Sequence, residues 1–238
     1  MKKKSLKKGG FKVKSNQIWD LPTRLFHWLL VIAIIGGFIS EKFNAMDLHR
    51  QFGITIGGLL VFRLMWGIIG ARHSRFTAFF PTPKRLKLYI EGKWTAEGHN
   101  PFGALAVLLL LGILMIQVAT GLFSNDDSTF FGPLAELINK EISDRLTHVH
   151  RFLEYLILGW IIVHLIAISI HVWIKKHPII RPMITGGKSH SESMDKKYLG
   201  GAFALILSIS IAIFVTYIMT GSWISKPQPL AVTSTPNF

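Results

Sequence analysis

The sequence contains no cysteine among its 238 residues. Without thiolates, the chain cannot form a disulfide bond, attach a c-type haem covalently, or hold an iron–sulfur cluster or a zinc ion through sulfur. A metal held by imidazole is still compatible with this composition, and the sequence has ten histidines. The main question is therefore which histidines are placed to bind a cofactor.

Charged residues are also scarce. Only 17% of the residues are charged and 50% are hydrophobic, which is too apolar for a soluble domain of this length. Five apolar stretches each approach the roughly 20 residues that cross the hydrocarbon core as a helix. They cover approximately 25–40, 52–70, 102–123, 152–174 and 201–223. The sequence therefore predicts an all-α membrane protein with five transmembrane helices.

Acidic residues are fewer than basic ones, 13 against 27. Most of the basic residues lie before the first apolar stretch and in the loops 71–100 and 175–198, whereas "EKFNAMD" and "SNDDSTFFGPLAELINKEISD" are acidic or nearly neutral. This alternation follows the positive-inside rule. It predicts a multi-pass membrane protein with a cytoplasmic N-terminus and a C-terminus on the outer side of the membrane. The basic charge then reflects topology and attraction to anionic lipid, and it argues against a nucleic-acid partner.

These patterns divide the chain into three parts. Residues 1–19 form a basic cytoplasmic tail, 20–188 hold the first four helices, and 189–238 hold a linker, the fifth helix and a periplasmic tail. The first apolar stretch keeps Arg24 and His27 at its start and lacks a small-residue cleavage site. We therefore interpret it as a retained helix rather than a signal peptide.

Four histidines lie within residues 148–171, at the start of the fourth apolar stretch or inside it, where ionisable side chains are costly and usually functional. His150 and His164 are fourteen residues apart, so an α-helix places them within about 40° of one face and about 21 Å apart. His148 points away from His164. His171 shares the face of His164 but lies only about 10 Å from it, too close for a separate cofactor layer.

The predicted topology supplies partners for this pair on other helices. His49 opens the second stretch at the outer side, at the depth of His150, and His27 opens the first stretch at the cytoplasmic side, at the depth of His164. Two imidazoles on one haem iron leave no open coordination position, which favours electron transfer. The sequence thus predicts two haem sites, with His49 and His150 in one and His27 and His164 in the other.

Several arginines lie near the predicted ends of the helices. Arginine can bind a haem propionate with two parallel hydrogen bonds, although contact with lipid phosphate explains each of them equally well. The propionate candidates are Arg24, Arg50, Arg63, Arg145 and Arg151.

The chain resembles the prokaryotic cytochrome b561 and nickel–iron hydrogenase b-type cytochrome family over about residues 19–188. The resemblance rests on "WDLPTRLFHW", "HRQFG", "RLMWGIIGARHSRF", "GHNPFGA", "QVATGLF", "GPL", the His150 and His164 pair, and "RPMITGGK". It implies a four-helix bundle with two non-covalent b-type haems and His27, His49, His150 and His164 as ligands. The fifth helix lies outside that four-helix core, and packing on the bundle and a role in assembly are both open for it.

The resemblance further implies electron transfer between quinone and a periplasmic partner such as a hydrogenase or a c-type cytochrome. His99 and Asn100 are quinone candidates, although helix capping is the simpler interpretation of both. The chain would then be the electron-transfer subunit of a quinone-linked oxidoreductase complex, with its oligomeric state left open. Two alternatives are a transporter or proton channel with a histidine relay, which the near absence of acidic residues inside the helices disfavours, and a passive membrane anchor.

Overall fold

The chain is described by a computed structural model that covers residues 19–71, 74–94, 100–127, 130–174, 176, 179–186 and 199–224. Its long helices are α1 (Leu21–Lys42), α2 (Met46–Ile69), α5 (Pro101–Gly121), α6 (Lys140–Ser169) and α8 (Leu199–Met219). Shorter ones are α3 (Phe76–Phe79), α4 (Pro83–Ile90), the 3-10 helix η1 (Ala135–Leu137), the π-helical turn η2 (Ile170–Ile174) and α7 (Ile180–Thr185). Among the described residues, five helices are long and apolar enough to cross a membrane. The predicted all-α membrane fold is confirmed.

Side-chain caps fix where three of these helices begin. The carboxylate of Asp20 accepts a hydrogen bond from the backbone N–H of Thr23 at 2.9 Å, and Pro22 lies in the first turn of α1. Asn100 caps α5 in the same way, and Asn139 caps α6. Such caps stabilise a helix by about 1 kcal/mol each. They lie outside the apolar stretches, so these helices begin earlier than hydrophobicity alone indicates.

The start of α6 shows the largest such difference. The apolar stretch predicts a beginning near residue 152, whereas α6 begins at Lys140. Its first turns are polar and are stabilised by the ion pairs Lys140–Asp144 and Glu141–Arg145, each four residues apart. The helix therefore extends beyond the apolar stretch as a polar segment.

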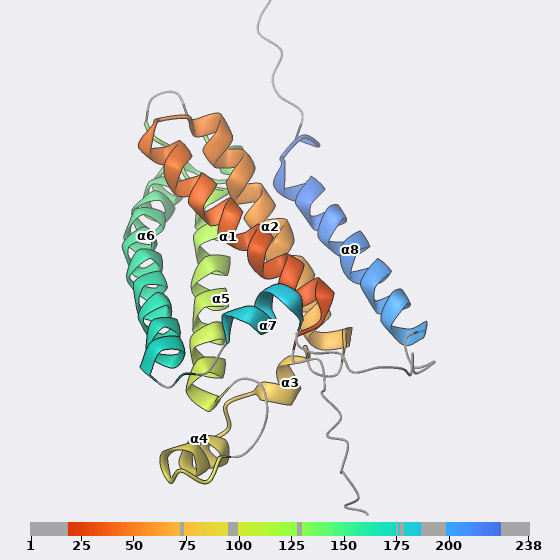
Figure 1. The fold of residues 1–238 in the computed structure, drawn as a ribbon. Helices are drawn as coiled ribbons and strands as arrows, with labels where there is room; N and C mark the ends of the chain where they lie inside the picture. Colours follow the sequence, from red (N-terminus) through yellow and green to blue (C-terminus); the bar gives the residue numbers. More distant parts are fainter. Residues whose placement is uncertain are drawn as a thin grey trace, which may run out of the picture.

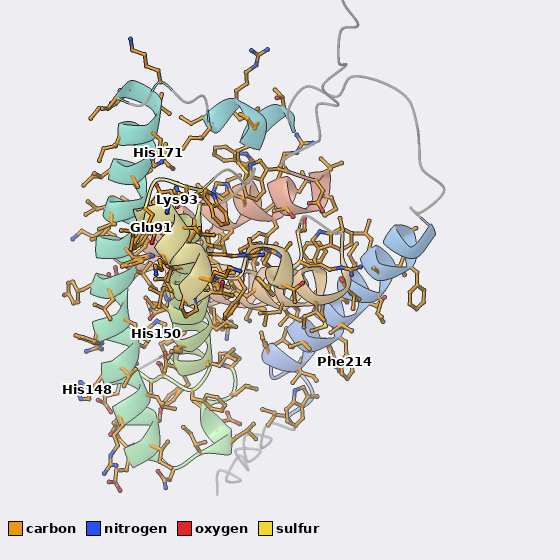
Figure 2. All side chains as sticks on the ribbon, turned by 90° about the horizontal axis from the view of Figure 1, so that it is seen from below. Glu91, Lys93, His148, His150, His171 and Phe214 are labelled. Carbon is orange, nitrogen blue, oxygen red and sulfur yellow. The ribbon has the colours of Figure 1, made fainter. Side chains whose placement is uncertain are left out.

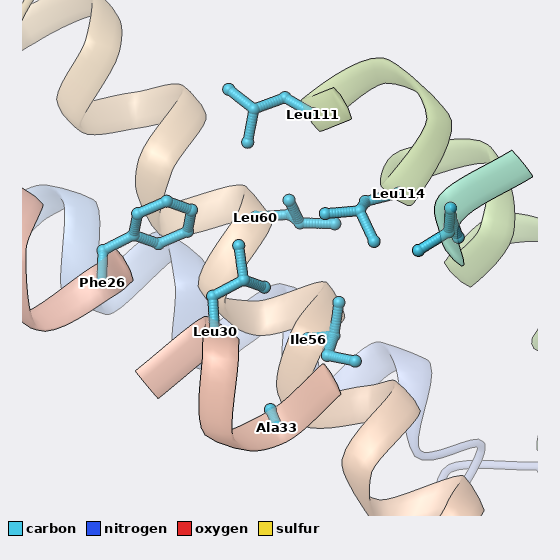
Figure 3. Close-up of a cluster of buried hydrophobic side chains, with 8 residues drawn as sticks. Phe26, Leu30, Ala33, Ile56, Leu60, Leu111 and Leu114 are labelled. Atoms are coloured by element: carbon cyan, nitrogen blue, oxygen red, sulfur yellow. The ribbon is translucent and has the colours of Figure 1, made fainter. Parts of the chain in front are cut away.

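The long helices form two groups joined along α2 and α5 (Figure 1). Helices α1 and α2 pack as an antiparallel pair, and α8 packs against α2. On the other side, α5 packs against α6, while the contacts of α6 with α1 and α2 are sparse. The core between the groups comes from all four of α1, α2, α5 and α6 (Figure 3), and consists of Phe26, Leu30, Ala33, Ile56, Leu60, Leu111, Leu114 and Ile157.

The outward faces of the helices are apolar. Large side chains such as Phe152 and Val163 on α6 and Phe214 on α8 are more than half exposed, and Figure 2 shows Phe214 on the side of α8 that faces away from the bundle. Other parts of the described protein do not cover these faces. In a membrane, the hydrocarbon core of the bilayer would keep their apolar side chains away from water. The chain is accordingly a multi-pass membrane protein.

The fifth helix packs on the bundle through small residues. A Cβ atom at Gly58 of α2 would collide with Oγ1 of Thr216, and one at Gly57 would lie 2.7 Å from the sulfur of Met219. On the α8 side, Ala204, Ser208 and Ala212 are buried. Small residues let two helix backbones approach closely in a membrane. Of the two roles left open by the sequence, packing on the bundle is therefore the one that the structure describes.

Candidate functional site

A cavity of about 330 Å³ opens at the end of the bundle where α1 turns into α2. It lies between α1 and α2 on one side and α5 and α6 on the other, where α6 leaves space by contacting α1 and α2 only sparsely. Its deep wall is apolar and includes Ile34, Phe38, Ile56, Leu114, Val118 and Ile157. Its mouth is polar and includes Glu41, Arg50, Asn125, Arg151 and Glu154. Apolar walls with a few polar groups are typical of a cofactor site.

His49 and His150 face each other across this cavity. Their ring centroids are 6.2 Å apart, and the ring planes are nearly perpendicular. Nδ1 of His49 lies 3.0 Å from the carbonyl oxygen of Gly37, and Nδ1 of His150 lies 2.9 Å from that of Gln117. A carbonyl oxygen only accepts hydrogen bonds, so Nδ1 carries the proton in both rings. Each Nε2 is therefore the nitrogen with a free lone pair for a metal, and the Gln117 amide, which donates to Nε2 of His150 at 3.2 Å, would have to move aside for a metal to bind there.

This separation fits one metal between two imidazoles. An imidazole nitrogen binds a transition metal at about 2 Å and lies about 1 Å from its own ring centre, so two rings on one metal have centroids about 6 Å apart. Gly53 of α2 also lines the cavity, and a Cβ atom there would meet nothing within 4 Å. The open space at Gly53 thus leaves room for a flat cofactor whose metal lies between the two rings. Their role as ligands stays a prediction.

His27 and His164 form a second pair toward the other end of the bundle. Both imidazoles are half-buried, and the ring of His27 packs edge-on against Trp28 at 5.1 Å. Nδ1 of His27 is buried and has no hydrogen-bond partner among the described residues. A buried polar atom without a partner requires an explanation, and a bound cofactor is one. Helix geometry places His164 about 21 Å along α6 from His150.

The remaining histidines of α6 lie apart from these pairs. His148 is exposed, as predicted, and Figure 2 shows it directed away from the bundle, on the opposite side of α6 from His150. His171 lies in the π-helical turn η2, where the α-helical spacing assumed from the sequence no longer holds, and its Nδ1 donates to the carbonyl of Ala167 at 2.9 Å. His73, His177 and His190 lie outside the described residues, as does His99.

The candidate arginines lie at both ends of the bundle. Arg50 and Arg151 line the cavity, although Arg50 also pairs with Asp47 at 2.8 Å. Arg145 is exposed and pairs with Glu141. At the opposite end of the bundle, the Arg24 guanidinium donates to the carbonyl of Ile184 at 2.6 Å and so connects α1 to α7.

Arg63 is buried in a polar network that joins the start of α1 to the end of α2. It donates to the carbonyl of Ser74 at 3.1 Å and lies over the ring of Phe76. The carboxylate of Asp20 accepts from the Trp66 indole at 2.9 Å and from the Ser74 hydroxyl at 2.6 Å. These partners already occupy Arg63, and Arg63 does not line the described cavity.

Of the two quinone candidates, Asn100 lies among the described residues. His99 lies outside the described residues. The side-chain oxygen of Asn100 accepts a hydrogen bond from the backbone N–H of Gly103 at 2.7 Å, so it caps α5. Capping is the simpler of the two interpretations that the sequence allowed, and a quinone contact at Asn100 stays a prediction.

Sequence reasoning missed the residues of α5 that surround His150, namely Gln117, Thr120 and Gly121. One signal was present: Gln117 is a polar side chain within the apolar run "LLLLGILMIQVATG". Polar side chains inside a membrane helix usually contact the protein interior. Which face of α5 meets α6 is a tertiary property, and a single sequence does not contain it.

The chain is similar to known membrane cytochromes. A family model described as prokaryotic cytochrome b561 matches residues 18–186. Two curated relatives, from Escherichia coli K12 and Escherichia coli O157:H7, are each described as a probable Ni/Fe-hydrogenase 1 B-type cytochrome subunit. Each is 23% identical over 219 residues, a match that covers 75% of this chain and 92% of the relative. No solved structure matches the chain significantly.

Proposed function

The chain belongs to the prokaryotic cytochrome b561 family, and from that membership we propose that it is a dihaem cytochrome relaying electrons across the membrane between the quinone pool and a redox partner. The family makes the chain a membrane b-type cytochrome of electron transfer with b-type haem as its cofactor. The number of haems, the quinone and the partner are the parts that we propose.

The observation that carries the proposal is the pair of rings His49 and His150. Their spacing of 6.2 Å, with each Nδ1–H directed at a carbonyl oxygen, supports coordination of one iron by the two Nε2 atoms. We assign His27 and His164 to a second haem, because the sequence places both at the same depth toward the cytoplasmic side. When bound between two imidazoles, haem iron exchanges single electrons and offers no open position to a substrate.

Other residues that line the cavity would bind the outer haem and keep water away from it. We propose that Arg50 and Arg151, at the polar mouth of the cavity, bind the propionates of the outer haem, because guanidinium matches a carboxylate with two parallel hydrogen bonds. The apolar deep wall excludes water, and exclusion of water is one of the factors that set a redox potential. Arg24, Arg63 and Arg145 stay propionate candidates of lower rank, since none of them lines the described cavity.

The proposed redox partner rests on the descriptions of the two relatives. Their description as hydrogenase cytochrome subunits supports a hydrogenase-like enzyme, or else a c-type cytochrome, as the partner. We propose that it docks at the end of the bundle that holds the α1–α2 turn, on the periplasmic side of a bacterial inner membrane. Quinone then reacts near the cytoplasmic end, with His99 and Asn100 as candidate contacts.

The haem content of the purified protein tests the proposal. We expect two haem b per chain in a pyridine haemochrome assay and a sharp b-type α-band after dithionite reduction. His150→Ala removes a ligand and should leave one haem, whereas His148→Ala, two residues away and exposed, should leave both. Absence of the α-band from the wild-type protein would instead favour a histidine relay for transport. Equal loss of haem in both variants would contradict the assignment of His150.

A further inference from the structure

The last turn of α5 forms a socket around the imidazole of His150. The carbonyl oxygen of Gln117 accepts the Nδ1–H bond at 2.9 Å, and Oγ1 of Thr120 lies 3.4 Å from the same nitrogen. Gly121 lies directly against the ring. Three residues within about one helical turn of α5 therefore lie against the ring of a single side chain on α6.

Gly121 is required for the ring to fit. A Cβ atom at this position would lie 2.7 Å from Cε1 and 3.0 Å from Nδ1 of His150, closer than non-bonded atoms approach. The ring cannot turn away freely, because its Nδ1–H is held by the Gln117 carbonyl. By contrast, a Cβ atom at Gly112 on the same helix would meet nothing within 4 Å. The need for glycine is thus local to the socket.

The Gln117 side chain contacts the other ring nitrogen. Its amide nitrogen lies 3.2 Å from Nε2 of His150, and its amide oxygen is buried without a hydrogen-bond partner among the described residues. An amide N–H donates, so it uses the Nε2 lone pair that a metal would need. Gln117 therefore contacts both nitrogens of His150. Its carbonyl oxygen holds the proton on Nδ1, and its side-chain amide lies next to Nε2, the nitrogen that would bind a metal.

We infer that Gln117, Thr120 and Gly121 are positioning residues that fix the tautomer and orientation of His150, and thereby the occupancy and redox potential of the outer haem. The inference rests on the proposed function, since it concerns the ligand of a haem site. Hydrogen bonds to the second nitrogen of a metal-bound imidazole orient the ring and raise its basicity. A more basic ligand stabilises the ferric state and lowers the midpoint potential.

The first test compares Gly121→Ala with the matched variant Gly112→Ala. We expect Gly121→Ala to lose at least half of one haem per chain, and the haem that remains at the outer site to show a shifted low-spin EPR signal. Gly112→Ala should keep two haems and both wild-type signals. The inner haem signal should be the same in both variants, which separates a local effect on His150 from general misfolding.

A second test does not depend on the stability of the alanine variant. Thr120→Val keeps the shape of the side chain and removes the hydroxyl, which donates to the Gln117 carbonyl at 3.0 Å and lies 3.4 Å from Nδ1 of His150. The midpoint potential of the outer haem should therefore shift, whereas Thr120→Ser should keep the wild-type value. A change in Gly121→Ala or in Thr120→Val that its control lacks supports the inference, and no change in either overturns it. A wild-type protein with fewer than two haems would overturn the proposed function as well, so the two failures are distinguishable.

Discussion

At the scale of single residues, Gly53 and Gly57 of α2 have different surroundings although one helical turn separates them. Gly53 borders the cavity with open space beside it, while Gly57 lies against Met219 of α8 and Val118 of α5. Their spacing in the sequence fits both close packing of helices and close approach of a flat ligand. In the structure, the first glycine faces the cavity and the second faces other helices.

Gly53→Leu tests the role of this open space. The added side chain would enter the cavity beside His49 and His150, so we expect the haem content to fall from two to about one per chain. The protein should still fold, because no atom lies within 4 Å of the new Cβ. Gly159→Leu on α6 is the control, since its Cβ also meets nothing within 4 Å and Gly159 does not line the cavity. Retention of both haems in Gly53→Leu would place the outer haem elsewhere.

At the scale of elements, the sequence predicts the helices well and their ends poorly. Hydrophobic runs identify five membrane helices, because crossing the hydrocarbon core needs a certain length of apolar residues. The polar start of α6 escapes this signal, since ion pairs and the Asn139 cap stabilise it instead. The π-helical turn that carries His171 also escapes it, because it depends on local packing.

The candidate site is predictable to a similar extent. Helical spacing and matched depth predict the pairs His49 with His150 and His27 with His164, because both follow from regular geometry. The structure places the rings of the first pair 6.2 Å apart. Of the five arginine candidates, Arg50 and Arg151 line the described cavity, and the role of all five stays a prediction. Arginine side chains are long and flexible, so position along a helix does not fix their partners. Arg63, for example, is fully engaged with Ser74 and Phe76.

The contact between α2 and α8 gives a prediction for an element. Gly58→Ala would bring a Cβ atom into Thr216, and we expect the overpacked contact to cost about 1–3 kcal/mol of unfolding free energy. Adding Thr216→Ala should restore part of that loss, with a coupling of about 0.5–3 kcal/mol. The measurement is a double-mutant cycle on unfolding in detergent. Additive effects of the two substitutions would show that α8 does not pack on α2 at this point.

At the scale of the whole molecule, the two histidine pairs lie at different depths of one bundle, and α6 contributes a residue to each. In the proposed function, a chain arranged in this way would carry electrons between the two sides of a membrane. If electrons pass through both sites in series, loss of either site interrupts the path. A passive membrane anchor would show no such dependence.

His27→Ala and His49→Ala test this series arrangement. Each variant should keep one haem, and redox titration should show which of the two wild-type components is lost. In proteoliposomes, we expect electron transfer from a membrane-soluble quinol to trapped ferricyanide to fall to background in both variants. His171→Ala is the control, because its ring bonds within its own helix. Persistent transfer in His27→Ala would favour the anchor.

The sparse contact of α6 with α1 and α2 has a consequence for biogenesis. One proposed ligand of each haem comes from α6 and the other from α1 or α2, so each haem would join two helical groups that otherwise meet chiefly through α2 and α5. A ligand that binds only the folded state stabilises it by mass action. When haem is scarce, newly inserted chains would therefore stay loosely closed and open to proteolysis. Haem supply would in this way set how many copies of the protein mature.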